Sequence, residues 1–182
     1  MTTQQFIPYL QRELIEPNQL NINVDEWVYG PGLPANHPVI ESDRFDKVDA
    51  LIDGFNGNAA EIAPATKDWT THEWIHFIRH LKEDISVTQL QSLEREFNFA
   101  SSGNSEIAAA WYEVAINSGY APQIMDDIES FLIGVGRRKF LMPLYGAMKE
   151  NDMLDKAHEI YGKARQNYHA ISVQSIDKLL KV

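Results

Sequence analysis

Residues 69–93 read WTTHEWIHFIRHLKEDISVTQLQSL and carry two consecutive helix-start signals. Each signal is a capping box, in which a Thr or Ser N-cap is followed three residues later by Glu or Gln. The two boxes are Thr70 with Glu73, and Ser86 with Gln89. A large apolar residue stands before each cap and one turn after it, as in a hydrophobic staple: Trp69 with Trp74, and Ile85 with Leu90. The sequence therefore predicts two helices joined by a short loop, which makes them antiparallel neighbours.

The helical pattern continues to the C-terminus. Further helices are expected from Asn104 or Ser105, over 124–132 up to Gly134 or Gly136, over 139–149, over 152–168 and over 172–180. Pro143 lacks a backbone donor, so the regular part of the 139–149 helix is expected to begin late. Strand-like alternation is sustained nowhere. The short loops therefore predict an all-α fold of stacked antiparallel helical hairpins.

The N-terminal part of the chain has a different character. Residues 4–16 predict a short helix with Phe6, Tyr9 or Leu10, and Leu14 on one side, and Pro17 ends it. The following stretch contains Gly30-Pro31-Gly32-Leu33-Pro34, which predicts an extended, turn-rich connector. The expected organisation is therefore a helix in 1–16, a linker in 17–42 and a helical domain in 43–182.

Composition excludes several classes of function. The 182 residues include 16 basic and 26 acidic side chains, for a net charge of −10, which argues against a nucleic-acid partner or an anionic membrane. There is no cysteine, so disulfides, thiol catalysis and zinc–cysteine clusters are excluded. No apolar run is long enough to span a bilayer, and the N-terminus does not resemble a signal peptide, so the cytoplasm is the expected location.

The segment His72-Glu73-Trp74-Ile75-His76 matches the H-E-x-x-H motif of zinc hydrolases. Two histidines one helical turn apart can bind zinc while the glutamate activates a water. His80 cannot join His72 on one ion, because eight residues of helix rise about 12 Å. The apolar stripe of this helix lies opposite, so the three histidines are expected to face water. Glu73 already serves the capping box, so the motif is interpreted as a chance match without a metal site.

Gly136-Arg137-Arg138-Lys139-Phe140 contains three adjacent cations at the expected start of a helix. The helix macrodipole is positive there, so cations are locally unfavourable unless an anion completes the site. The alternative is a solvated basic loop, or salt bridges to Asp126, Asp127 or Glu129.

Several segments together resemble the C-terminal domain of the leukotriene A-4 hydrolase family of zinc aminopeptidases. In chain order they are residues 27–34 (WVYGPGLP), Phe97-Asn98-Phe99, Asn104-Ser105-Glu106-Ile107 with Trp111, residues 136–140 with Pro143-Leu144, Tyr161 and His169. The resemblance runs from about residue 20 to the C-terminus. It implies a two-layer, right-handed superhelix of HEAT or armadillo type, and it makes the first helix the end of a preceding catalytic domain.

The same resemblance implies what this chain lacks. The family's zinc ligands, general base and exopeptidase motif belong to the upstream domain, and the third-ligand position counted from His76 is Arg95. The chain is therefore expected to have no cofactor of its own and no activity alone, with zinc in the full-length enzyme. In the family's Gly-Arg-x-Lys-Phe segment the arginine binds the free carboxylate of the substrate and the lysine assists, so Arg137 and Lys139 are the expected substrate-binding residues. Arg138 occupies the variable position and could exchange roles with Arg137.

Three functions follow as hypotheses. The first is an accessory domain of a zinc aminopeptidase, whose partners are the upstream catalytic domain and the substrate carboxylate. The second is a stand-alone helical scaffold that binds a protein partner. The third is a minimal zinc hydrolase that uses His72, Glu73 and His76.

Overall fold

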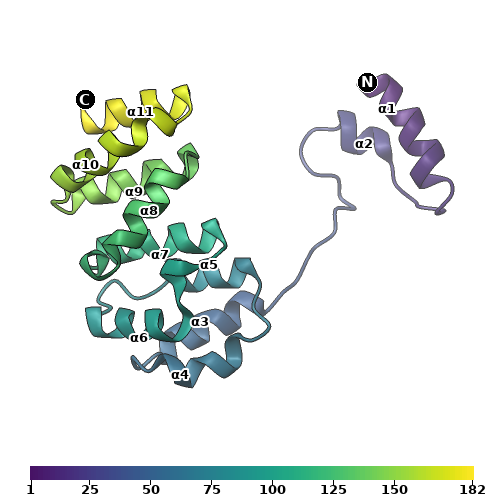
Figure 1. Ribbon diagram of the computed structural model, residues 1–182. Helices are drawn as coiled ribbons and strands as arrows, with labels where there is room; N and C mark the ends of the chain where they lie inside the picture. The colour runs from purple at the N-terminus through teal and green to yellow at the C-terminus, as the bar shows by residue number, and fades with distance from the viewer. The chain divides into compact units, whose positions relative to one another are not determined.

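The computed structural model describes residues 1–182, and all of its regular secondary structure is helical (Figure 1). The chain divides into two units, 1–42 and 43–182. The first unit contains α1 (Thr3–Leu10), which continues into a π-helical turn (Gln11–Ile15), and α2 (Val24–Tyr29). The second contains α3 (Arg44–Gly54), α4 (Ala59–Ile62), α5 (Thr71–Arg79), α6 (Val87–Phe97), α7 (Ser105–Asn117), α8 (Met125–Gly134), α9 (Arg138–Glu150), α10 (Leu154–Ala164) and α11 (Ala170–Leu180), with short 3₁₀ turns between some of them. The predicted all-α fold class is confirmed.

The two helix-start signals that predicted the fold are both confirmed. The backbone N–H of Thr70 donates to Glu73 Oε2 at 2.9 Å at the start of α5. The backbone N–H of Ser86 donates to Gln89 Oε1 at 2.9 Å at the start of α6. The rings of Trp69 and Trp74 meet edge to face with their centroids 4.8 Å apart, as the staple predicts.

The helices of the second unit form two rows. In one row α3, α5, α7, α9 and α11 each contact the next helix of the set. In the other row α4 contacts α6 and α8 contacts α10, while the 3₁₀ turn Phe99–Ser101 contacts both α6 and α8. Most consecutive helices thus alternate between the rows, which is the arrangement expected of stacked hairpins. The HEAT or armadillo type and the right-handed sense of the superhelix stay predictions.

The five helices of the first row run parallel, as the contacts between their ends show. Contacts join the N-terminal end of each helix to that of the next: Arg44 with Glu73, Thr71 with Asn104, Glu106 with Lys139, and Gly136 with Ser172. At the other end, Lys149 Nζ near the end of α9 donates to the Leu179 carbonyl of α11 at 2.8 Å. The positive ends of five helix dipoles therefore lie along one edge of the unit, which we call the N-terminal edge.

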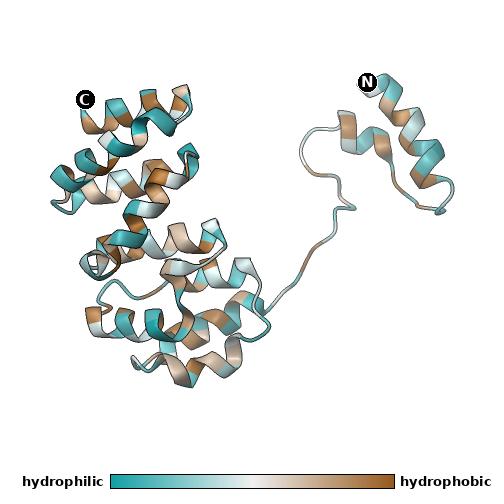
Figure 2. Cartoon of the chain, in the orientation of Figure 1, coloured by the Kyte–Doolittle hydropathy of each residue, from teal (hydrophilic) through white to brown (hydrophobic).

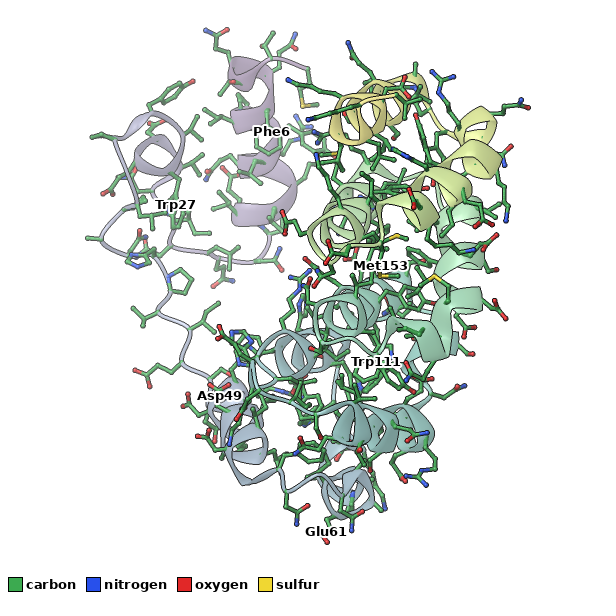
Figure 3. All side chains as sticks on the ribbon, turned by 90° about the vertical axis from the view of Figure 1, so that its left-hand side faces the viewer. Phe6, Trp27, Asp49, Glu61, Trp111 and Met153 are labelled. Atoms are coloured by element: carbon green, nitrogen blue, oxygen red, sulfur yellow. The ribbon has the colours of Figure 1, made fainter.

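The core is built from buried hydrophobic residues of both rows. Hydrophobic stretches, coloured brown, recur along these helices (Figure 2). The largest fully buried side chains of the core include Trp111, Tyr145, Tyr161 and Phe77. Trp111 lies within the stack among side chains of several helices (Figure 3). None of the helices is both long and apolar enough to cross a membrane.

Two local expectations are wrong. Helix α9 does not begin late: it starts at Arg138, and Pro143 lies inside it. Burial of Phe140, Leu141 and Leu144 stabilises this first part of the helix and offsets the hydrogen bond that Pro143 cannot donate. The stretch 17–42 is not wholly extended, since α2 forms within it behind an Asn23 N-cap whose side chain accepts from the Glu26 N–H.

Limited proteolysis tests the division at residue 42. No Lys or Arg lies between Arg12 and Arg44, so trypsin has no site in the connector. Chymotrypsin does, because Leu20, Trp27 and Tyr29 are exposed. We expect its first cuts after these residues, since α2 is only six residues long and buries none of them. Mass spectrometry identifies the cuts; early cleavage within 104–149 would contradict the core assignment.

Candidate functional site

The basic segment predicted from the sequence lies on the N-terminal edge of the second unit. Arg137 is the N-cap of α9, with extended backbone dihedrals, and Arg138 is the first residue of the helix. The Arg137 side chain makes no capping hydrogen bond, and the first turn of α9 contains no acidic residue. Three cations therefore stand at the positive end of a helix dipole, which is an unfavourable place for them without a counter-charge.

Phe140 brings Arg137 and Lys139 together. The Arg137 guanidinium carbon lies 5.8 Å from the centroid of the Phe140 ring, and Lys139 Nζ lies 5.1 Å from it. The ring is held in place, since Phe140 is only 6% exposed and packs edge to face on Phe131, with the centroids 5.9 Å apart. Two exposed cations thus share one aromatic ring that is fixed by the core.

The three cations of the segment differ in their contacts. Lys139 Nζ forms an ion pair with Glu106 Oε1 of α7 at 2.5 Å. Arg138 turns toward α11, where its Nε donates to Ser175 Oγ at 2.8 Å. Arg137 is exposed and makes no ion pair. The structure therefore separates Arg137 and Lys139, which share Phe140, from Arg138.

The acidic residues considered as partners for the segment do not reach it. Glu129 instead pairs with Lys156 at 2.8 Å and with Lys163 at 2.6 Å, and the two hydrogen bonds hold the pKa of Glu129 below its usual range. Asp126 and Asp127 form no ion pair with the segment. The alternative that salt bridges to Asp126, Asp127 or Glu129 neutralise the basic segment is therefore wrong.

Sequence reasoning missed the residues that fold against the segment. A small cavity of about 30 Å³ lies next to Lys139 and Phe140, and Arg79, Glu106 and Glu113 also line it. Glu106 lies 33 positions before Lys139 in the chain, so only the folded structure brings the two together. The one feature of Glu106 that the sequence shows is its place in the first turn of its own helix, where an acid stabilises the helix dipole.

The histidine motif of α5 is built into the contact between α3 and α5. His76 Nε2 lies 2.7 Å from Asp49 Oδ1, and the His76 ring stacks between Phe45 and His80, with centroids 4.4 and 4.0 Å away. The expectation that all three histidines face water is therefore wrong for His76, which is half-buried because Phe45 of α3 covers it. His72 and His80 are exposed.

Glu73 of the same motif is occupied by structural contacts. It is 3% exposed, accepts from the Thr70 backbone and hydroxyl, and pairs with Arg44 of α3. Burial raises the pKa of Glu73, but the hydrogen bonds from Thr70 and Arg44 outweigh it and lower that pKa to about 2. No group of three His, Asp or Glu side chains is placed to hold a metal ion. Glu73 and His76 thus already contact Thr70, Arg44 and Asp49, and the absence of zinc stays a prediction.

Fold and site together define a class: a two-row helical domain that presents a cationic segment on its N-terminal edge. The family described as "Leukotriene A4 hydrolase, C-terminal" matches residues 69–180. The chain belongs to this family, as the resemblance indicated.

Curated relatives extend the match beyond these residues. The chain is 26% identical to leucine aminopeptidase 2 of Ajellomyces capsulatus over 160 residues, 81% of this chain and 24% of the relative. It is 30% identical to leucine aminopeptidase 2 of Neurospora crassa over 128 residues, 67% of this chain and 19% of the relative. The match to the Candida albicans leucine aminopeptidase 2 covers 98% of this chain and 31% of the relative, at 26% identity. The chain thus spans about a quarter of the length of these relatives.

Metal analysis tests the interpretation of the histidine motif. After dialysis we expect no stoichiometric zinc, because Asp49 contacts His76 while Thr70 and Arg44 contact Glu73. Elemental analysis of the purified chain measures the zinc content. One tightly held zinc per chain that is lost in His76→Ala would contradict this expectation.

Replacing the buried carboxylate tests its structural role. Glu73→Gln keeps a side chain that can cap α5 but removes the charge that faces Arg44, so we expect a loss of about 1–3 kcal/mol in the free energy of unfolding at pH 7. Because the folded-state pKa is depressed, the carboxylate stabilises the fold above the unfolded-state value of 4.5 and loses this effect as pH falls toward about 2.

Urea unfolding of both proteins between pH 7 and about pH 2.5 measures the difference. The gap between wild type and Glu73→Gln should narrow as pH falls below 4.5. Glu83→Gln, at an exposed position, is the matched control and should leave stability unchanged. A gap that stays constant over this range would show that the charge of Glu73 contributes nothing.

Proposed function

We propose that this chain is the C-terminal helical domain of an aminopeptidase like those of the leukotriene A-4 hydrolase family, where it forms part of the wall of the substrate channel. Arg137 binds the free carboxylate of the peptide substrate, and Lys139 assists. The observation that carries the proposal is the exposed Arg137 guanidinium, which has no ion-pair partner and shares the Phe140 ring with Lys139.

Electrostatics supports a carboxylate as the ligand. Arg137 and Lys139 stand at the positive end of the α9 dipole, and Glu106 supplies a single counter-charge, which pairs with Lys139. A bound carboxylate would supply a second negative charge there. The planar guanidinium of Arg137 can donate two parallel hydrogen bonds to it, which a lysine cannot do.

The hydrolytic chemistry belongs to another part of the polypeptide in this proposal. Zinc held by the upstream catalytic domain would polarise the peptide carbonyl and activate the attacking water. This chain would then have no activity alone, and the enzyme is expected in the cytoplasm. The coverage of the relatives supports a separate catalytic region, since the matched part is only 19% to 31% of their length.

The first unit supports the same proposal. Large apolar side chains on α1 and α2 and on the turn after α1 are exposed, among them Phe6, Tyr9, Leu14 and Trp27. Figure 3 labels Phe6 on α1 and Trp27 on α2. Large apolar side chains gathered on the surface of so small a unit are typical of a face that another domain covers. We expect the catalytic domain to cover them in the complete enzyme.

Substitution of Arg137 in the complete enzyme tests the assigned role. A charge-assisted hydrogen bond contributes about 1.5–3 kcal/mol, so Arg137→Ala should lower kcat/KM for a tripeptide with a free carboxylate by about 10- to 150-fold. An aminoacyl anilide has no carboxylate to lose and should be affected far less. Arg137→Lys should restore part of the activity on the tripeptide.

Arg138→Ala is the matched control, because it removes a neighbouring guanidinium that points toward Ser175. It should leave the ratio of the two kcat/KM values unchanged. Equal losses on both substrates in Arg137→Ala would indicate a structural arginine. An effect confined to Arg138→Ala would transfer the role to that residue.

A further inference from the structure

A second cationic surface lies between α9 and α11, on the side of α9 away from Glu106 of α7. It is a groove of about 830 Å³. The residues that line it are Arg138, Met142, Lys149, Gln174, Ser175, Lys178 and Leu179. Three of them are cations and none is an acid, although acidic residues outnumber basic ones by 26 to 16 in the chain.

None of the three cations has a carboxylate partner. Arg138 donates to the Ser175 hydroxyl at 2.8 Å, and Lys149 donates to the Leu179 carbonyl at 2.8 Å. Lys178 is exposed and makes no ion pair. Elsewhere in the second unit cations do form ion pairs with acids: Lys156 and Lys163 both pair with Glu129. The groove thus concentrates positive charge that the protein itself does not neutralise.

The spacing of the charges indicates the size of the ligand. Arg138 and Lys149 stand near opposite ends of α9, about 16 Å of helix apart, but their side chains reach Ser175 and Leu179, which lie one helical turn, about 6 Å, apart on α11. An extended peptide covers this range of distances with about two to five residues. Met142 and Leu179 supply apolar surface in the same groove, and Gln174 supplies an amide that can bond to a peptide backbone.

We propose that this groove binds an acidic peptide segment of a partner protein. The segment carries carboxylates about two to five residues apart, one facing Arg138 and the other facing Lys149 and Lys178, with an apolar side chain between them on Met142 and Leu179. A nucleic acid or an anionic membrane fits less well, because the net charge of −10 repels a large polyanion. The site needs internal carboxylates rather than a free C-terminus, so it does not depend on the role of Arg137.

The test uses the 182-residue chain and the fluorescein-labelled peptide Glu-Glu-Ala-Leu-Ala-Glu-Glu, amidated at its C-terminus so that Arg137 has no terminal carboxylate to bind. Fluorescence anisotropy at low salt measures the affinity. The Arg138→Glu/Lys178→Glu double variant should weaken binding about tenfold or more, because it places like charges against the peptide. The Lys67→Glu/Arg95→Glu variant makes the same total change of charge at exposed positions outside the groove and should stay within about twofold.

A milder variant keeps the test independent of folding. Lys178→Gln removes one positive charge that forms no ion pair within the protein, so the fold should not change. It should weaken binding of the peptide about threefold. The same peptide with Gln in place of Glu should bind about tenfold more weakly than the acidic one. Absence of binding, equal binding of the Gln peptide, or unchanged affinity in the Arg138→Glu/Lys178→Glu variant would overturn the proposal. Binding to phosphatidylserine vesicles without binding to the peptide would overturn it as well, in favour of a membrane surface.

Discussion

The parallel alignment of α3, α5, α7, α9 and α11 is the constraint on which the rest of the second unit depends. Five helix dipoles side by side place their positive ends along one edge and their negative ends along the other. Each edge then needs compensating groups. Glu73 in the first turn of α5 and Glu106 in the first turn of α7 supply acids at the N-terminal edge, and Lys149 donates to a terminal carbonyl at the opposite edge.

This compensation is incomplete at helix α9, and the first turn of α11 likewise contains no acid. The first turn of α9 has no acid and follows Arg137 directly, so the edge is locally cationic. Glu106 neutralises Lys139 from the neighbouring helix, but no acid reaches Arg137. Arg138, the next residue along the chain, turns instead to the other side of α9, toward α11. One run of three cations thus lies on two separate surfaces, which we propose bind a terminal carboxylate and an acidic peptide segment respectively.

Features that depend on local chemistry could be predicted from the sequence. Caps and staples place the starts of α5 and α6 because their hydrogen bonds join residues three apart. The basic run is visible as well, and its unfavourable place on the helix dipole points to an anion. The late start expected for α9 is wrong because the core burial of Phe140 and Leu141 overrides the effect of Pro143.

Contacts between distant segments could not be predicted in this way. The periodicity of α5 alone places His76 opposite the apolar stripe and so predicts that it faces water. In the structure His76 contacts Asp49, which belongs to α3. Single-sequence periodicity describes one helix at a time and does not identify the helix that covers it.

The most direct measurement of the central claim is a crystal structure of the complete enzyme with a bound tripeptide that has a free carboxylate. We expect the carboxylate within hydrogen-bonding distance, about 3 Å, of the Arg137 guanidinium, with Lys139 close by on the same side of Phe140. A carboxylate bound instead to Arg138, or to a residue outside 136–140, would contradict it.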